Sequence, residues 1–217
     1  MAKDIAIYGA GGFGKEVACL IDRINNSQPE PQWNLVGFFD DGKAIGTEIS
    51  HYGSVLGGMT ELNAWSSPLA VSIAIGRPST VCSIESRINN PLISYPNLID
   101  PNFRIIDNRS FNIGVGNIIQ SDCVASCDVY IGNFNVLNGS VVLGHDVTIH
   151  DYNVIMPGVR VSGGVNIGFH NFLGVNSVVL QLLTIGQDVT LAAGSVLMTK
   201  PKDNNIYIGV PAKRFKY

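Results

Sequence analysis

The chain has 217 residues, of which 46% are hydrophobic, so it is long enough and apolar enough to bury a core of one large or two modest domains. Its 14 basic and 17 acidic residues give a net charge of -3, which supplies no broad positive field for a nucleic-acid backbone or an anionic membrane. We therefore expect a small-molecule ligand and no nucleic-acid or membrane partner.

Targeting and cysteine patterns indicate a cytoplasmic protein without disulfides. No long apolar segment follows the first basic residue, and no later run reaches the roughly 18 apolar residues of a membrane span. The four cysteines show neither a CxxC pair nor zinc-ribbon spacing, so we expect buried, reduced thiols and no metal site at Cys19, Cys82, Cys123 and Cys127.

The first part of the chain alternates strand-like and helix-like segments. Apolar strand-like runs occupy 4–8, 35–39 and 69–75, and helix-like patterns follow the glycine-rich turn 9–14 and occupy 60–65 and 79–88, where Ser79 is a candidate helix cap. This alternation predicts a small, Rossmann-like parallel α/β domain over residues 1–92. A connector with Pro91, Pro96 and Pro101 separates it from a second domain, residues 93–217.

The second domain has a six-residue repeat. Every sixth residue from Ile113 is Val, Ile or Leu, except for Ala125, and the series is Ile113, Ile119, Ala125, Ile131, Leu137, Leu143, Ile149, Ile155, Val161, Ile167, Leu173, Val179, Ile185, Leu191 and Leu197. One hexad supplies a short strand and a turn with its aliphatic residue inside, and three hexads close a triangular coil. These fifteen hexads predict a parallel β-helix of about five coils, each covering the apolar face of the next.

Within this repeat, one histidine falls at a position that faces outward. Val141 and Leu143 take the inward positions, so we expect His145 to be exposed, where an imidazole can accept a proton near neutral pH. Asp146 is placed to fix its tautomer if the fold brings the two side chains together. A surface histidine without a role is the alternative.

The glycine-rich turn between the first strand and helix predicts a phosphate site. Gly9, Gly11 and Gly14 fit GxGxxG, with Gly12 additional, and backbone N-H groups at the helix start can cradle phosphates. Alone, this pattern suggests a dinucleotide site, but Asp40 lies further along than the usual ribose-binding acid. A plain turn at the strand end is the alternative for Asp40 and Asp41.

Several motifs together resemble one enzyme family. They are IYGAGGFGKEV (7–17), FFDD (38–41), AIG (74–76), YPNLIDP (95–101), LNGSVVLGHD (137–146) and GVPAK (209–213). The chain resembles the sialic acid O-acetyltransferase and bacillosamine-type UDP-amino-sugar N-acetyltransferase family over nearly its full length. The resemblance implies a left-handed β-helix, a homotrimer with active sites at subunit interfaces, and acetyl-CoA as cosubstrate.

The resemblance also implies roles for individual residues. His145 matches the general base, Asp146 its acidic partner, and Asn138 an asparagine near the acetyl group. The implied coenzyme site comprises Gly164, Gly174, Ala193, Gly194, Pro211 and Lys213. The implied sugar-nucleotide site comprises Gly9, Gly11, Gly12, Phe13, Gly14, Lys15, Asp40, Asp41 and Gly76.

The chain departs from the family pattern at three positions. The family often has histidine where this chain has Phe13, Val154 and Asp100, so contacts to phosphates and thioester are expected to differ.

A zinc site is the other possibility for the histidines. The spacing of His145 and His150 is similar to that of two zinc ligands in γ-class carbonic anhydrases, but the upstream region offers Arg109 in place of a third histidine, so no metal is expected. We interpret His170 as a surface or interface residue.

We therefore expect transfer of acetyl from acetyl-CoA to an amine, or a hydroxyl, of a nucleotide-linked sugar, in surface glycan or polysaccharide synthesis. The nucleotide is expected to be UDP. O-acetylation of sialic acid or another sugar hydroxyl is one alternative. A non-catalytic nucleotide-binding scaffold is the other.

Overall fold

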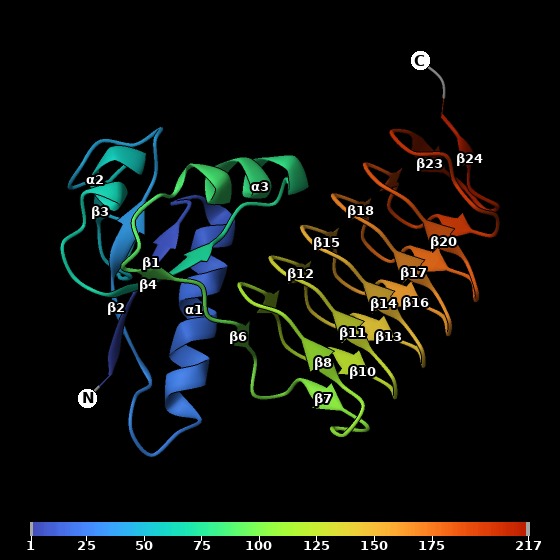
Figure 1. Ribbon diagram of the computed structural model, residues 1–217, viewed down its shortest axis with the longest axis horizontal. Helices are drawn as coiled ribbons and strands as arrows, with labels where there is room; N and C mark the ends of the chain where they lie inside the picture. The colour runs from blue at the N-terminus through green and yellow to red at the C-terminus, as the bar shows by residue number, and fades with distance from the viewer. Residues whose placement is uncertain (1, 216–217) are drawn as a thin grey trace.

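The computed structural model describes residues 2–215, which form an N-terminal α/β domain and a triangular β-solenoid (Figure 1). In the N-terminal domain, five parallel strands form a sheet in the order β3-β2-β1-β4-β5. The strands are β1 (Lys3–Tyr8), β2 (Trp33–Phe39), β3 (Val55–Gly57), β4 (Leu69–Ile73) and β5 (Ile93–Ser94), and the helices are α1 (Gly12–Asn26), α2 (Met59–Asn63) and α3 (Pro78–Arg87).

The predicted elements of this domain are confirmed within a few residues, and two short strands were missed. β3 and β5 are edge strands of three and two residues, too short for a periodic signal. One detail was wrong: α3 begins at Pro78, with Arg77 as its N-cap, so Ser79 lies inside the helix and caps nothing. Proline presets the backbone dihedral φ for the first helical position, which is why the helix begins there.

The solenoid consists of three parallel sheets, called faces here. Face 1 comprises β6 (Leu98–Ile99), β9 (Ile118–Ile119), β12 (Val136–Leu137), β15 (Val154–Ile155), β18 (Phe172–Leu173), β21 (Thr190–Leu191), β23 (Ile206–Ile208) and the antiparallel β24 (Lys213–Arg214). Face 2 comprises β7 (Arg104–Ile105), β10 (Val124–Ala125), β13 (Val142–Leu143), β16 (Arg160–Val161), β19 (Val178–Val179) and β22 (Val196–Leu197). Face 3 comprises β8 (Asn112–Ile113), β11 (Tyr130–Ile131), β14 (Thr148–Ile149), β17 (Asn166–Ile167) and β20 (Thr184–Ile185).

The six-residue repeat explains this architecture. Successive strands of one face are 18 residues apart, as in the pairing of Leu143 with Val161, so three hexads make one coil. Fourteen of the fifteen aliphatic positions are buried, and Ile113, in the first complete coil, is half-buried. The predicted β-solenoid is thus confirmed, while its left-handed twist stays an expectation from the resemblance.

The glycine that often follows the aliphatic residue has a steric cause. A Cβ atom at Gly144 would lie 2.7 Å from the backbone nitrogen of Gly163 in the next coil, closer than any real Cβ contact. The left-handed residue of the corner comes two positions later, at Asp146, where φ is 57°. The corner glycine therefore permits close stacking of coils, and a different residue turns the chain.

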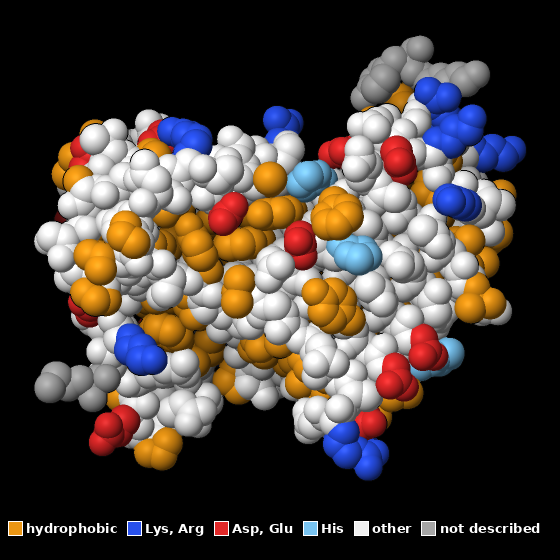
Figure 2. All heavy atoms as spheres, in the orientation of Figure 1, with side chains coloured by type: hydrophobic (Ala, Val, Ile, Leu, Met, Phe, Trp, Pro, Cys, Tyr) orange, Lys and Arg blue, Asp and Glu red, His pale blue; other side chains and the backbone are white. Residues whose placement is uncertain are grey.

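Face 1 carries the N-terminal domain. Its outward residues Leu98, Ile118, Val136 and Val154 are at most 2% exposed and share a hydrophobic cluster with α1, which lies between the sheet and the solenoid in Figure 1. Hydrophobic side chains also gather along the junction of the two parts in Figure 2. The chain passes from one part to the other between β5, which pairs with β4, and β6, which pairs with β9.

An ion pair between a half-exposed arginine and a buried aspartate links the two parts at this junction. Arg23 of α1 donates from Nε to Asp100 Oδ2 at 2.6 Å and from Nη2 to Oδ1 at 3.1 Å, and the Asp100 side chain is only 1% exposed. Burial opposes ionisation of Asp100, but hydrogen bonds from Arg23 and the Asn102 N-H, with the Arg23 charge, hold its pKa below the ordinary value. Asp100 is therefore an ionised partner of α1.

The cysteine expectation was wrong in part. All four thiols are free, but only Cys123 is buried, whereas Cys19 is exposed and lies 2.9 Å from the hydroxyl of Tyr52. No helix within residues 2–215 is long and apolar enough to cross a membrane.

Candidate active site

His145 and Asp146 form a hydrogen-bonded pair at the corner between faces 2 and 3. The corner follows β13, and His145 Nδ1 lies 2.6 Å from Asp146 Oδ2. Both side chains are about two-thirds exposed, at 65% and 64%, as the inward positions of Val141 and Leu143 require. A carboxylate against Nδ1 favours the tautomer with the proton on that atom, which leaves Nε2 able to accept one.

The backbone of the next coil forms a seat for the His145 ring. Gly163 occupies the position 18 residues after His145, and a Cβ atom there would overlap Nε2, Cε1 and Cδ2 of the imidazole. The ring therefore packs directly on the Gly163 backbone. We did not anticipate this residue, although adding one coil length to His145 points to it.

Asn138 lies elsewhere in the coil. It follows β12 and sits at the corner between faces 1 and 2, where it is buried, and its Nδ2 has only long contacts to Ile155 O at 3.4 Å and Met156 Sδ at 3.5 Å. His145 follows β13, one strand later. The two proposed catalytic side chains of one chain therefore stand at different corners and are not brought together.

Asn138 lines a small pocket between α1 and face 1. The pocket has a volume of about 170 Å³, and its walls are Phe13, Glu16, Gly76, Val136, Asn138, Val154 and Met156. Phe13 and Val154, where the resembling family often has histidine, thus face the same space. In this chain that space is mainly apolar, with one carboxylate and one amide.

The glycine-rich turn divides into two kinds of glycine. Gly9 has φ of +114°, and a Cβ atom there would lie 2.7 Å from Ala74 O, while one at Gly14 would overlap Gly9 O, so both permit close packing. Gly11 and Gly12 are exposed, with open space where a Cβ would be, at the start of α1. Their surface is accessible to a phosphate, and Lys15 and Gly76 are exposed nearby on α1 and after β4.

Asp40 and Asp41 stabilise this edge of the sheet. Asp40 accepts hydrogen bonds from the N-H groups of Ala10 and Gly42, both at 2.8 Å, and so holds the glycine-rich turn. Asp41 accepts from the Met59 N-H and the Tyr8 hydroxyl, both at 2.8 Å. The Met59 hydrogen bond is the main reason that the pKa of Asp41 lies below its ordinary value. The Asp40 and Asp41 carboxylates therefore hold neighbouring segments in place, as well as forming a turn at the end of β2.

The implied coenzyme residues lie in three places. Gly164 is at the corner between faces 2 and 3, whereas Gly174, Ala193 and Gly194 are at the corner between faces 1 and 2, and Pro211 and Lys213 belong to the C-terminal segment. The N-H groups of Gly164, Gly174 and Gly194 donate to carbonyls of neighbouring coils at 2.7–2.8 Å. Those three groups are already used, so we do not expect them to donate to a coenzyme.

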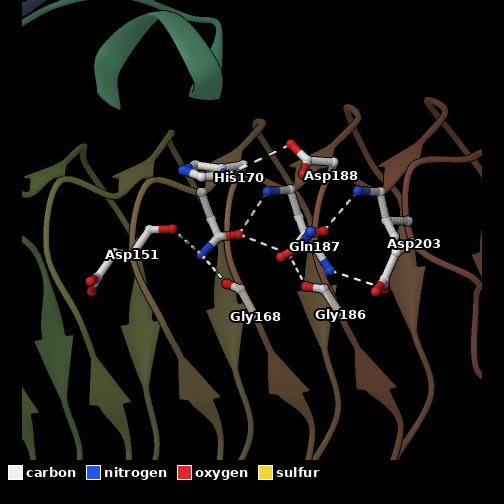
Figure 3. Close-up of polar contacts among 10 residues, drawn as sticks. Asp151, Gly168, His170, Gly186, Gln187, Asp188 and Asp203 are labelled. Carbon is white, nitrogen blue, oxygen red and sulfur yellow. Dashed lines mark hydrogen bonds and ion pairs between the residues drawn. The ribbon is translucent and has the colours of Figure 1, made fainter. Parts of the chain in front are cut away.

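The other three histidines, His51, His150 and His170, each lie against an aromatic ring, and His51 contacts Tyr52. His150 stacks on Phe169 with ring centroids 5.0 Å apart, and His170 lies 5.5 Å from Tyr152 and 3.8 Å from the Asp188 carboxylate. Figure 3 shows His170 and Asp188 side by side beneath α3. His170 therefore belongs to the domain junction. Within residues 2–215, no three His, Cys, Asp or Glu side chains are grouped to hold a metal ion.

Comparison with known proteins agrees with this two-part organisation. Residues 4–84 match the family model of the PglD N-terminal domain. The acetyltransferase domain of PglB from Neisseria gonorrhoeae FA1090, solved in complex with acetyl coenzyme A, has 26% identity and a TM-score of 0.86, covering 99% of this chain and 100% of that one. WeeI from Acinetobacter baumannii AYE has the same identity, TM-score and coverage.

A more distant structure shares the fold. A mutant of perosamine N-acetyltransferase from Caulobacter crescentus, in complex with CoA and GDP-perosamine, has 23% identity and a TM-score of 0.85, covering 100% of this chain and 99% of that one. Residues 4–84 thus form a PglD N-terminal domain, and the chain as a whole is similar from end to end to the acetyltransferase domain of PglB and to WeeI.

Proposed function

We propose that this chain is an acetyl-CoA-dependent N-acetyltransferase that acts on a nucleotide-linked amino sugar in glycan biosynthesis. One observation carries the proposal: an exposed His145 whose Nδ1 is held by Asp146, in a chain whose two domains match the PglB acetyltransferase along their whole length. We assign nucleotide-sugar binding to residues 1–92 and acetyl transfer to residues 93–217. UDP as the nucleotide and a cytoplasmic location stay predictions.

His145 is proposed as the general base of a direct transfer. The free amine attacks the thioester carbonyl, and as the C-N bond forms Nε2 takes a proton from the nitrogen. The C-S bond then breaks, and the imidazolium returns the proton to the departing CoA sulfur. Asp146 stabilises the imidazolium that forms between these steps. A backbone N-H beside His145 is proposed to stabilise the oxyanion.

The proposed site is shared between copies of the chain. The corner with His145, Asp146 and Gly164 and the corner with Asn138, Gly174 and Gly194 are the two ends of face 2. When three copies turn face 2 toward a common axis, the first corner of each meets the second corner of its neighbour. The homotrimer implied by the resemblance thus brings His145 of one copy to Asn138 of the next.

The side chains of face 2 suit this arrangement. Four of its outward residues, Val124, Val142, Val178 and Val196, are half-buried and apolar, and the other two are Arg104 on the first strand and Arg160 within the column. The outward residues of face 3 are polar except for Tyr130, and they are Asn112, Tyr130, Thr148, Asn166 and Thr184. A column of valines left half-exposed favours burial against another copy, whereas face 3 favours water.

The interface is tested by a matched pair of lysine substitutions. Val142→Lys places a charge in the proposed contact and is expected to yield monomers in sedimentation, because an unpaired charge there loses its hydration. Thr148→Lys, one strand later and outward on face 3, is expected to sediment like wild type. A stable, active wild-type monomer would contradict the trimer.

The reaction is tested by following CoA release with UDP-linked and GDP-linked amino sugars. Wild type is expected to acetylate the amine of at least one of them, and His145→Ala is expected to lose about 10²- to 10⁴-fold in turnover. Unchanged turnover of His145→Ala would remove the base assignment. Isothermal titration with acetyl-CoA separates the scaffold alternative, which predicts no binding.

The role of Asp146 is tested by Asp146→Asn. We expect turnover to fall about 10- to 100-fold, since the amide no longer selects the tautomer with a free Nε2. Asp128→Asn is the control, because Asp128 occupies the same corner position one coil earlier with a similar φ of 55°. Equal activity of the two variants would contradict the role of Asp146.

A further inference from the structure

The pocket beside Asn138 contains one charged side chain to which no role has been assigned. Glu16 lies on α1, is exposed to solvent and lines the pocket with Asn138. Among residues 2–215, its carboxylate has no hydrogen bond or ion pair. The other walls are apolar side chains and Gly76, so Glu16 sets the charge of this space.

The interdomain ion pair explains why Glu16 stands level with Asn138. Glu16 precedes Arg23 by seven residues, which is two turns of helix on the same stripe and a rise of about 10.5 Å. Asp100, the partner of Arg23, directly follows Ile99, which pairs with Ile119. Ile119 pairs in turn with Leu137, which directly precedes Asn138, so Asp100 and Asn138 are two strand spacings apart, or about 9.6 Å. The two rises match, so the Arg23 contact places Glu16 at the coil of Asn138.

The polar atoms of the pocket select for donors. The Glu16 carboxylate accepts hydrogen bonds only, and Asn138 directs Nδ2 toward Ile155 O and Met156 Sδ, which leaves its Oδ1 as a second acceptor. Among residues 2–215, no lysine, arginine or histidine lines the pocket. An ammonium group, with three N-H donors and a positive charge, satisfies these acceptors, whereas a hydroxyl offers one donor and a carboxylate is repelled.

We propose that Glu16 is the specificity-determining residue of the acceptor site: its carboxylate binds the ammonium group of the amino sugar and disfavours hydroxyl and acidic sugars at that position. This inference rests on the proposed function. The bound ammonium group loses one proton to solvent before transfer, and the free amine then attacks beside the same carboxylate, which stabilises the positive charge that develops on the nitrogen. Proton removal remains the task of His145 from the neighbouring copy.

The test compares Glu16→Gln with wild type, using GDP-perosamine or the preferred amino-sugar nucleotide as acceptor and its matched hydroxyl sugar as a competitive inhibitor. Glu16→Gln is expected to raise the KM for the amino sugar about 10- to 100-fold, the value of a hydrogen bond to a charged group. The inhibition constant of the hydroxyl sugar is expected to change by no more than about twofold, because a neutral hydroxyl forms no ion pair with the Glu16 carboxylate. Glu30→Gln, in an exposed loop, is the matched control.

The outcomes separate this inference from the function on which it rests. A wild-type protein that acetylates the amino sugar, with Glu16→Gln unchanged in KM, overturns the role of Glu16 alone. Equal weakening of amino and hydroxyl sugars also overturns it, because Glu16 would then bind a group that both share. Failure of wild type to acetylate any amino sugar overturns the proposed function and this inference together.

Discussion

At the residue scale, the outward direction of His145 could be predicted from the sequence, but the packing of its ring on Gly163 could not. Alternation along the hexad leaves only an outward direction for His145, and its neighbour Asp146 was the expected partner. Gly163 contacts the imidazole because coils repeat every 18 residues, a register that emerges only when the strands pair. The positions of Glu16 and Asn138 in one pocket likewise depend on how α1 packs, which no local pattern encodes.

Gly163→Ala tests whether the coil seats the catalytic ring. The added methyl overlaps the imidazole, so His145 must turn away, and a misplacement of about 1 Å costs up to about 10²-fold in turnover. Turnover should fall by about that factor while thermal unfolding and acetyl-CoA binding change little.

Gly139→Ala is the control for that substitution, because its Cβ would meet Ser121 O at an ordinary contact distance of 3.6 Å. Full activity of Gly163→Ala, measured by CoA release, would show that His145 needs no such seat.

At the element scale, the sequence contains a second repeat beside the aliphatic one, an asparagine every 18 residues, which our prediction of the coil did not include. Four asparagines, one per coil, are fully buried at the corner between faces 3 and 1, at positions Asn117, Asn135, Asn153 and Asn171. Each accepts from the backbone N-H 18 residues on, as Asn153 does from Asn171 at 2.9 Å. Asn153 and Asn171 also donate from Nδ2 to the carbonyl oxygens of Gly168 and Gly186, as Figure 3 shows. These amides pair buried backbone groups at the corner, which aliphatic side chains could not do, although Nδ2 of Asn135 has no partner within residues 2–215.

Asn153→Ala is expected to lower the free energy of unfolding by about 2–5 kcal/mol. The change leaves the Asn171 N-H and the Gly168 carbonyl buried without their partner, and each such group costs about 1–3 kcal/mol. Urea unfolding at fixed protein concentration measures the loss.

Asn166→Ala, outward and exposed on face 3, should stay within about 0.5 kcal/mol of wild type. Equal stability of the two variants would mean that the buried asparagine column does not hold the corner.

At the scale of the whole molecule, the division into two domains could be predicted but their mutual packing could not. Proline spacing and the change of period marked the connector, yet the contact of α1 with face 1 arises from side chains 77 residues apart, such as Arg23 and Asp100. Asp100 stands where the resembling family often has histidine, and here it supplies the charge that anchors α1. The split of the candidate site between two corners is also a property of the assembled coil.

Asp100→Asn is expected to lower Tm at pH 7, because Arg23 loses its charged partner. The pKa of Asp100 is lower in the folded chain than the ordinary value of about 3.9, so its carboxylate contributes stability above that pH and loses it as pH falls through the folded pKa. The Tm difference between wild type and variant should therefore be largest above about pH 5 and should disappear as the pH falls toward about 2.

Asp22→Asn, an exposed neighbour on α1, should show no such pH-dependent difference. A Tm gap for Asp100→Asn that persists at low pH would contradict the ionic origin of this contact.

The most direct test of the shared site is complementation between two inactive variants. His145→Ala and Asn138→Ala, coexpressed with different tags and purified as mixed trimers, each leave one corner of the site intact. If a site takes His145 from one copy and Asn138 from the next, each mixed trimer has one intact site in three, and acetyl transfer to the amino sugar should return to about a third of wild type. Mixed trimers no more active than either variant alone would place both side chains in the same copy and contradict the account.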